Sequence, residues 1–482
     1  MHLKNLIGSE WRSTGDTLES IRPATGETLA WVPRSNAEDI DQAVKDAAIA
    51  QPAWGRRSRE ERALVLERIA DGIESRLDEF ASAESADTGK PVSLASRVDI
   101  PRAIANFRFF AGAIRHTHEE MYPMADALNY TLRQPLGVVG LITPWNLPIY
   151  LLSWKAAPAL AMGNAVVAKP SELTPWTATL LGEVALEAGL PAGVYNVVHG
   201  FGAEAGAALV EHSDVKAISF TGGTATGRVV AAQASSSFKK LSLELGGKNP
   251  TLVFADADFD RAVEGAARAA FTNQGQVCLC GSRILVQREL YPRFVEALSE
   301  RVQAMKVGDP SDPETQLGAL VSAAHRDKVD SYISLARDEG GTVVAGGSRP
   351  AIGAQFSGGF FLEPTVITGL PTTSRCATEE IFGPVATVHP FEDEDEAVAV
   401  SNGVEYGLAA SVWTRDLGRA HRVSARLESG MVWVNTWLHR DLRVVFGGMK
   451  NSGVGREGGE YSLDFYSEAR NICIKLDDGG SR

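Results

Sequence analysis

Residues 165–199, AVVAKPSELTPWTATLLGEVALEAGLPAGVYNVVH, indicate the fold class. The stretch begins with the apolar run Ala165–Lys169, continues with a helical pattern over Thr174–Ala188 and ends with a second apolar run, Val194–His199. Short, near-continuous apolar strands joined by a helix are typical of a parallel sheet covered on both faces. Two further runs of the same kind lie on either side, at Gly137–Ile142 and Val215–Phe220. The sequence therefore predicts an α/β domain of the nucleotide-binding type.

The rest of the chain continues this pattern. A second α/β region begins near Asn249, with expected strands at 251–254, 283–287 and 342–345 and expected helices at 260–272, 290–302 and 323–339. Residues 1–34 are expected to form short strands and turns. Helices are then expected over Asn36–Gln51, from Ser58 towards Phe80, over Asp99–His116 and over Glu204–Glu211. Because 482 residues exceed what one hydrophobic core usually supports, we expect several domains.

Composition and charge exclude several classes of function. The net charge of -13 argues against a nucleic-acid partner, because phosphate neutralisation needs a basic surface. No apolar run is long enough to span a membrane, and the N-terminus does not resemble a signal peptide. Four cysteines in a chain of this length do not form a disulfide framework, which favours a cytoplasmic location. The nine histidines lack zinc-site spacing, so no catalytic metal is expected.

A candidate nucleophile lies in Phe271–Gly281, FTNQGQVCLCG. Small and amide side chains lead directly into Cys278, and such a turn can present a thiol to a cleft. Upstream, Glu244 stands beside a Gly-Gly pair in LELGGKN. A thiol that attacks a carbonyl and a carboxylate that activates water are the two parts of a covalent mechanism. A lone cysteine is more often a small buried hydrophobe, so the hypothesis depends on other motifs.

Two stretches are candidates for a cofactor site. Phe220–Gly227, FTGGTATG, follows a strand and opens a helix, so its backbone N–H groups can face a pyrophosphate. Lys169 and Glu172 follow another strand, at the sheet edge where ligands bind. A carboxylate there accepts ribose hydroxyls and repels a 2′-phosphate, which favours NAD over NADP. Residues 200–205, GFGAEA, fit a short dinucleotide fingerprint but lack the acidic partner further on, so a plain turn is preferred.

Seven motifs occur together in a fixed order. They are TPWN (143–146), KPSE (169–172), FTG (220–222), ELGGK (244–248), QGQVC (274–278), EEIFGP (379–384) and FGGMK (446–450). In this set and order the chain resembles the NAD(P)-dependent aldehyde dehydrogenase superfamily over almost its whole length. The resemblance implies a Rossmann-type cofactor domain, an α/β catalytic domain and a small β oligomerisation arm.

The resemblance also implies roles for individual residues. Cys278 would add to the aldehyde, Asn146 and the backbone N–H of Cys278 would hold the resulting oxyanion, and Glu244 would activate the hydrolytic water. The residues implied in NAD binding are Thr143, Trp145, Lys169, Glu172, Gly222, Thr224, Leu245, Glu380 and Phe382. Without the resemblance, Glu244 could be a solvated acid and Asn146 a turn residue.

The chain departs from the family pattern at three positions. Gly223 stands where a serine often contacts a phosphate, and Val445 stands where proline usually precedes the Phe-Gly-Gly turn. Cys280 lies two residues after the candidate nucleophile. A packed small residue is the preferred interpretation of Cys280, and a redox role is the alternative.

Two arginines suggest the substrate. The resemblance places Arg102 on a helix that lines the substrate tunnel and Arg440 near the tunnel mouth, and a guanidinium can bind a carboxylate bidentately. Arg97 and Arg443 are alternative partners. By composition alone, the preferred interpretation is two surface arginines paired with neighbours such as Asp99 and Asp441. The chain is most similar to the branch that oxidises 2-aminomuconate or 2-hydroxymuconate 6-semialdehyde.

The expected architecture has three parts. Residues 1–116 and 136–246 form the NAD-binding domain, 247–460 the catalytic domain, and 117–135 with 461–482 the oligomerisation arm. The edge-strand pattern of Asn471–Lys475 suggests pairing with another subunit in a homodimer or homotetramer. The alternatives are a dehydrogenase for an aromatic, aliphatic or betaine-type aldehyde, and a catalytically silent member of the family.

Overall fold

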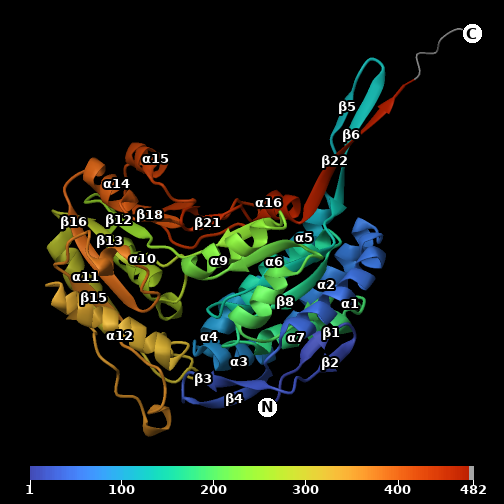
Figure 1. Cartoon of the computed structure of the whole chain (residues 1–482). Coiled ribbons are helices and arrows are strands. Elements are labelled where there is room, and N and C mark those ends of the chain that lie inside the picture. Colours follow the sequence, from blue (N-terminus) through green and yellow to red (C-terminus); the bar gives the residue numbers. More distant parts are fainter. Residues whose placement is uncertain (477–482) are drawn as a thin grey trace, which may run out of the picture.

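The computed structural model describes residues 1–476 and contains two large sheets, each flanked by helices, with a narrow arm projecting from one end (Figure 1). The first sheet has eight strands. In spatial order they are β2 (Glu10–Arg12), β1 (Asn5–Ile7), β9 (Tyr195–Val197), β8 (Ala165–Lys169), β7 (Val138–Ile142), β10 (Val215–Thr221), β11 (Lys240–Glu244) and β21 (Gly453–Val454). The run from β9 to β11 is parallel, as the apolar strands predict.

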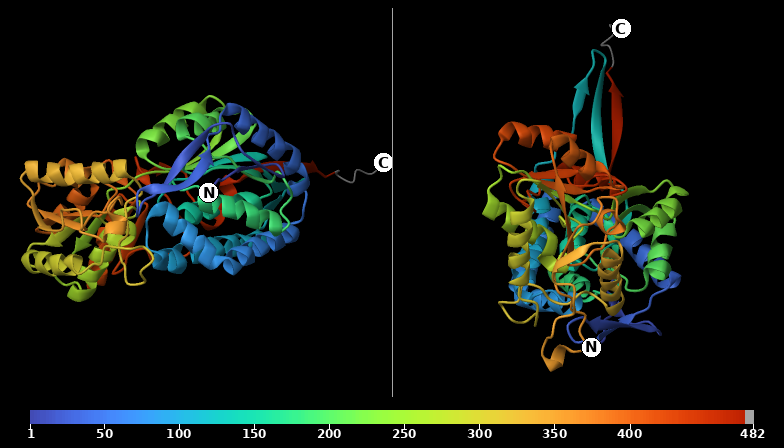
Figure 2. Two further views of the ribbon diagram at one scale, coloured as in Figure 1. Left: turned by 90° about the horizontal axis from the view of Figure 1, so that it is seen from below. Right: turned by 90° about the vertical axis from the view of Figure 1, so that its left-hand side faces the viewer.

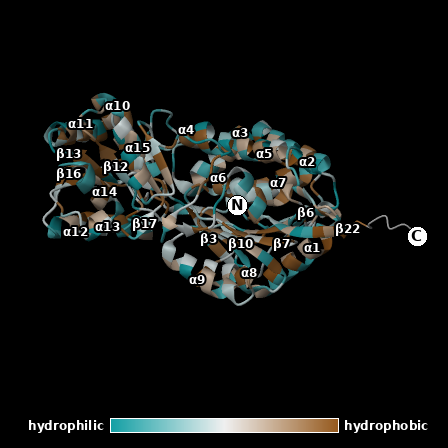
Figure 3. Cartoon of the chain, turned by 90° about the horizontal axis from the view of Figure 1, so that it is seen from above, coloured by the Kyte–Doolittle hydropathy of each residue, from teal (hydrophilic) through white to brown (hydrophobic). Residues whose placement is uncertain are grey.

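Helices cover both faces of this sheet. One face packs on α2 (Arg59–Ser75), α5 (Ile100–Arg115), α6 (Pro148–Ala161) and α7 (Trp176–Glu187). The other face packs on α1 (Ala37–Gly55), α8 (Ala207–Glu211) and α9 (Thr224–Ser235). Alternate residues of β7 and β8 enter the two cores: Val139 and Val166 face one, and Val138 and Val167 the other. The helices that cover the sheets mix hydrophilic and hydrophobic residues (Figure 3).

The second sheet has seven strands. Their spatial order is β14 (Thr342–Ala345), β15 (Thr365–Thr368), β16 (Val385–Phe391), β13 (Arg283–Gln287), β12 (Pro250–Val253), β18 (Ala409–Trp413) and β19 (Met431–Val434). Its helices are α10 (Phe259–Phe271), α11 (Tyr291–Gln303), α12 (Ala323–Asp338), α14 (Glu394–Asn402) and α15 (Leu417–Arg426). The predicted strands and helices of this half lie within about one residue of those observed.

Shorter elements complete the fold. The hairpin β3 (Thr17–Arg22) and β4 (Glu27–Pro33) and the pair β17 (Tyr406–Gly407) and β20 (Met449–Lys450) form small sheets. The remaining helices are α3 (Leu77–Thr88), α4 (Val92–Leu94), α13 (Arg375–Thr378) and α16 (Gly459–Phe465). Single turns of other helix types are η1 (Ala95–Asp99), η2 (Gly202–Gly206), η3 (Thr272–Gly275) and η4 (Ala354–Phe356).

The arm is a three-stranded antiparallel sheet that stands away from the body in the right-hand view of Figure 2. β6 (Ala127–Pro135) is its central strand, between β5 (Met121–Pro123) and β22 (Ser467–Lys475). β22 pairs with β6 of the same chain along its whole length, from Ser467 opposite Pro135 to Lys475 opposite Ala127. The strand that was predicted to lie at an edge is therefore hydrogen-bonded on one side by β6 of the same chain. The predicted arm also includes residues 477–482, which lie outside the described residues.

Two local predictions were wrong. The helix expected from Ser58 towards Phe80 is two helices, because Arg76 leaves helical geometry, with φ -110° and ψ 23°, between α2 and α3. There the guanidinium of Arg76 binds Glu79, three residues further on, and also Glu183; the second contact joins distant segments, and no periodicity signals it. The helix expected over Glu204–Glu211 starts instead as the wide turn η2 and becomes regular only in α8.

The described part of the chain contains no helix that combines the length and apolar character needed to cross a membrane. All four cysteines are free thiols.

Candidate active site

Cys278 is held at the end of a strained turn. Asn273 and Gln274 both have a φ of 55°, a left-handed conformation that is uncommon for residues other than glycine. Gly275 follows at φ 68°, and a Cβ there would lie 2.1 Å from the carbonyl oxygen of Gly383, so only glycine fits. The Asn249 side chain donates to the carbonyl of Cys278 at 2.7 Å. The half-buried thiol is thus fixed by backbone geometry rather than by its own contacts.

Glu244 ends β11 and is nearly fully buried, at 4% exposure. Neither of its carboxylate oxygens has a hydrogen-bond partner among the described residues. Burial and the neighbouring Glu457 raise the pKa of Glu244 well above its ordinary range, while Lys155 opposes that shift. Burial, with Glu244 and Glu380 next in effect, raises the pKa of the Cys278 thiol to about 12. The thiol and the carboxylate therefore act on each other electrostatically.

Asn146 lies in the loop after β7, with 4% exposure. Its side-chain amide donates to the carbonyl of Gln276 at 2.9 Å, which ties it to the turn that precedes the thiol. An amide carries two N–H donors, so one remains for a substrate oxygen. The structure therefore brings Asn146 and Cys278 together, as the resemblance implies.

A cavity of about 280 Å³ opens over the thiol. It is lined by Pro144, Trp145, Asn146, Leu151, Thr221, Gly222, Gly223, Leu245, Gly246, Cys278, His325, Lys328, Glu380 and Phe382. The cavity unites six of the residues predicted from the sequence: Trp145, Asn146, Gly222, Leu245, Glu380 and Phe382, together with Cys278 itself. Trp145 and Phe382 meet edge to face with ring centroids 5.3 Å apart, and Gly247 N–H donates to Glu380 Oε1 at 2.8 Å.

The remaining predicted cofactor residues lie beside this cavity on neighbouring strand ends. Lys169 Nζ binds Glu172 Oε2 at 3.1 Å at the end of β8, and Thr143 N–H donates to the carbonyl of Lys169. Thr224 opens α9 after the glycine turn, as the sequence predicts. A Cβ on Gly223 would meet no atom within 4 Å, so the missing serine leaves open space rather than a clash.

Arg102 and Arg440 converge on the same aromatic side chains. The Arg102 guanidinium lies 5.2 Å from the Tyr150 ring and 5.9 Å from the Trp154 ring. The Arg440 guanidinium lies 5.4 Å from Trp154 and 4.2 Å from Phe446, and it donates to the Tyr150 hydroxyl. Each arginine also has a buried nitrogen, Nε of Arg102 and Nη2 of Arg440, without a partner among the described residues.

The acids that could have neutralised these arginines are engaged elsewhere. Asp99 binds Lys90 at 2.6 Å, and Asp441 binds Arg443 at 2.5 Å. Burial lowers the pKa of Arg102, as does the nearby charge of Arg440, while Tyr150 and the charge of Asp441 raise it. Arg102 and Arg440 are therefore a pair of adjacent cations in the part of the chain that the structure describes, not two surface ion pairs.

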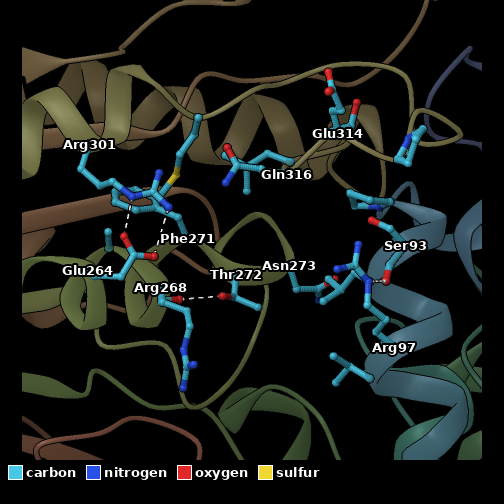
Figure 4. Close-up of a pocket in the computed structure, with 18 residues that line it drawn as sticks. Ser93, Arg97, Glu264, Arg268, Phe271, Thr272, Asn273, Arg301, Glu314 and Gln316 are labelled. Atoms are coloured by element: carbon cyan, nitrogen blue, oxygen red, sulfur yellow. Dashed lines mark hydrogen bonds and ion pairs between the residues drawn. The ribbon is translucent and has the colours of Figure 1, made fainter. Parts of the chain in front are cut away.

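The alternative arginines lie apart from this pair. Arg443 is exposed and paired with Asp441. Arg97 lines a separate, open cavity of about 420 Å³ between α4, η1 and the helices α10 and α11, with Arg268 and Arg301 (Figure 4). There Arg301 binds Glu264 and Arg97 donates to the Ser93 carbonyl. Arg97 and Arg443 therefore lie apart from Tyr150 and Trp154, the aromatic side chains that Arg102 and Arg440 share; neither Arg102 nor Arg440 is among the residues that line the cavity over Cys278.

Several site residues escaped the sequence analysis. Lys155 on α6 binds Glu457 at 2.8 Å, and Ser219 and Ser242 donate to the same carboxylate, which forms a buried polar cluster next to Glu244. His325 contacts both Trp145 and Phe382 in the cavity wall. The apolar periodicity of α6 hides Lys155, and no local pattern signals the other residues.

Comparison with known proteins places this site in a family. The profile of the aldehyde dehydrogenase family matches residues 11–472. The chain belongs to the aldehyde dehydrogenase family. It is 51% identical to 2-hydroxymuconic semialdehyde dehydrogenase from Pseudomonas sp. strain CF600, over 96% of this chain and 97% of that protein. It is 49% identical to 2-aminomuconic semialdehyde dehydrogenase from Danio rerio, over 98% of each.

Solved structures agree with this assignment of the fold. The NAD+ complex of an aldehyde dehydrogenase from Bacillus cereus superposes with a TM-score of 0.96 at 40% identity, covering 99% of this chain and 97% of that one. The predicted fold class and the predicted family are therefore confirmed.

Proposed function

We propose that this enzyme oxidises a semialdehyde that carries a distal carboxylate, with NAD as the oxidant, during the catabolism of aromatic ring-cleavage products. The substrates that fit are 2-hydroxymuconate and 2-aminomuconate 6-semialdehyde. The names of the similar proteins from Pseudomonas and Danio rerio contain 2-hydroxymuconic and 2-aminomuconic semialdehyde. The observation that carries the proposal is the convergence of Arg102 and Arg440, neither of which forms an ion pair with a carboxylate among the described residues. A carboxylate on the ligand would complete this pair.

Cys278, Asn146 and Glu244 divide the chemistry at the other end of the substrate. The Cys278 thiol releases its proton to solvent, its sulfur adds to the aldehyde carbon, and the oxygen that becomes negative is held by the free N–H of Asn146. After oxidation the acyl group stays on the sulfur as a thioester. Glu244 takes a proton from the water that hydrolyses this thioester, which releases the acid.

The residues around the cavity fit NAD. Glu172 can accept ribose hydroxyls beside Lys169, the backbone at Gly222 and Thr224 can face the pyrophosphate, and Glu380 with Phe382 can hold the nicotinamide end. The buried hydroxyl of Thr221 has no partner among the described residues and faces the same region. NAD, when bound there, supplies the acceptor for the hydride that leaves the substrate carbon. Trp145 and Leu245 line the wall around it, and Thr143 lies beside them in the loop after β7.

The direct test compares two substrates on the purified protein. We expect NADH to form with a kcat/KM for 2-hydroxymuconate semialdehyde that exceeds the value for propanal by about two orders of magnitude. Equal values would replace the proposal by a dehydrogenase for an uncharged aldehyde. No NADH from any aldehyde would favour a catalytically silent protein.

Removal of the arginine pair should act on substrate binding. Arg102→Met or Arg440→Met is expected to raise KM for the semialdehyde about ten- to hundredfold, because a charge-assisted hydrogen bond contributes about 1.5–3 kcal/mol. KM for propanal should change little. Arg97→Met, on the separate cavity shown in Figure 4, is the matched control. The measurement is steady-state kinetics with both aldehydes. The same change of KM in all three variants would contradict the assignment.

The arm fits an assembly of several copies, and we propose that the protein works in the cytoplasm, where its free thiols stay reduced. We propose a homodimer or homotetramer in which the arm, residues 117–135 with 461–482, contacts a second copy. In this proposal the NAD-binding domain consists of residues 1–116 and 136–246, and the catalytic domain consists of residues 247–460. The arm exposes Met121, Tyr122, Met124 and Ile474. Replacing Tyr122 and Met124 by Lys is expected to shift the protein towards smaller species in size-exclusion chromatography with light scattering. An unchanged mass would contradict this role for the arm.

A further inference from the structure

Lys90 is a charged side chain that the proposed chemistry leaves unexplained. It follows Gly89 at the turn between α3 and α4 and has an exposure of 0%. The turn is locked in place: the Ala319 N–H donates to the carbonyl of Gly89, and the Ser85 hydroxyl donates to the carbonyl of Lys90. A buried ammonium costs several kcal/mol unless it is well paired, so its contacts indicate what it holds.

The first contact is the backbone of Asn146. Lys90 Nζ donates to the Asn146 carbonyl at 3.1 Å, and the Asn273 side chain donates to the same oxygen at 3.1 Å. The side chain of Asn146 in turn donates to Gln276. Asn146 is thus held at its main chain by Lys90 and at its side chain by the turn before Cys278.

The second contact is Asp99, at 2.6 Å from Nζ. Asp99 ends η1 and precedes the first turn of α5, which carries Arg102 three residues later. Glu84 is a further acid near Nζ, at 3.9 Å, and it accepts hydrogen bonds from Thr177 and from the N–H of Ile149 on α6. One ammonium therefore joins the loop of Asn146 to the start of the helix that bears Arg102.

We propose that Lys90 is a positioning residue that fixes the distance between the two ends of the substrate site, through Asn146 at the aldehyde end and through Asp99 and α5 at the carboxylate end. The role of Lys90 in positioning Asn146 requires only the aldehyde dehydrogenase activity of the family. Its role in positioning Arg102 rests on the proposed function. A semialdehyde of fixed length needs both ends in register, because an error of about 1 Å at the reacting carbon can lower the rate about a hundredfold.

Physical chemistry explains why this cluster is charged. Burial raises the pKa of Asp99 and of Glu84, and Lys90 lowers both. Without Lys90 each acid can take up a proton instead of remaining a buried charge. The Lys90→Met variant should therefore fold, and the loss of the ammonium group should mainly misplace Asn146.

The experiment compares Lys90→Met with Lys239→Met. Lys239 is also buried, and its ammonium donates to the backbone carbonyls of His212 and Val215, away from the proposed substrate site. We expect Lys90→Met to lower kcat with propanal about ten- to hundredfold, and Lys239→Met to change it less than about twofold. Equal losses in the two variants, at similar melting temperatures, would overturn the proposal.

A double-mutant cycle separates positioning from general destabilisation. If Lys90 acts through Asn146, Lys90→Met should have almost no further effect on kcat in a protein that already carries Asn146→Ala. Independent, multiplicative losses would overturn the Asn146 part. Because propanal has no carboxylate, this result holds even if the semialdehyde proves to be the wrong substrate.

Asp99→Asn tests the other end. It keeps the shape of the side chain but removes the charge that anchors α5, so KM for 2-hydroxymuconate semialdehyde should rise at least about threefold more than KM for propanal. An equal change in both KM values would overturn the link to Arg102. A wild-type enzyme without any preference for the semialdehyde would refute the proposed function instead.

Discussion

Cys278→Ser is expected to reduce NADH formation by more than about a thousandfold with every aldehyde. A serine hydroxyl fills the same space but is a much weaker nucleophile than a thiolate. His325 lines the same cavity, but its Nε2 bonds to the Phe382 carbonyl rather than to the side chain at position 278. The measurement is the steady-state rate of NADH formation with propanal and with the semialdehyde.

The neighbouring thiol provides the control for this substitution. Cys280 is 6% exposed and packs in the core beneath the turn. Cys280→Ala should keep most of the activity and lose some thermal stability, because a small buried group is removed. Near-wild-type activity in Cys278→Ser, or loss of activity only in Cys280→Ala, would show that Cys278 is not the nucleophile.

The pH dependence of alkylation tests the environment of the same thiol. Burial raises the pKa of Cys278 to about 12, so at neutral pH the enzyme without ligands holds it almost wholly protonated. Only the thiolate reacts, and its fraction grows about tenfold for each pH unit below that pKa. Carbamidomethylation of Cys278, mapped by mass spectrometry, should therefore accelerate steadily from pH 7 to pH 10. A plateau near neutral pH would show that the thiolate is stabilised in a way this structure lacks.

Sequence reasoning succeeded where local patterns determine the structure. The apolar runs of β7, β8 and β10 and the amphipathic α10 and α12 carry their periodicity in the chain, so their positions could be predicted. The turn before Cys278 was predictable because glycine and amide residues tolerate the left-handed conformations observed there. The family was predictable because its motifs are short, ordered and separated by characteristic distances.

Contacts between distant segments could not be predicted in this way. The break at Arg76, the Lys155–Glu457 pair and the three contacts of Lys90 all depend on which segments meet in space. Arg97 and Arg102 lie five positions apart in sequence, yet Arg97 faces the cavity of Figure 4 and Arg102 faces Tyr150. The helical periodicity of a sequence identifies which residues share a face, but it does not tell which neighbouring element that face will contact.

Glu244→Gln is expected to stop the enzyme after a single turnover. The amide has the shape of the acid but cannot take a proton from water, so the thioester on Cys278 should accumulate. Rapid mixing should show a burst of about one NADH per site, followed by a steady rate at least about a hundredfold below that of the wild type. Intact mass spectrometry of the quenched protein should show the acyl group on Cys278.

The wild-type pH profile should carry the signature of the same carboxyl. Burial and Glu457 raise the pKa of Glu244, so the group is neutral and inactive as a base below that pKa and becomes active as the pH rises through it. The steady rate should therefore increase with pH in the wild type, and this rising limb of the pH profile should be absent in Glu244→Gln. Glu211→Gln, which changes a surface carboxylate that binds Gln233, should leave both the burst and the limb intact. If Glu244→Gln instead abolished the burst itself, Glu244 would be needed before hydride transfer, for activation of the thiol rather than of water.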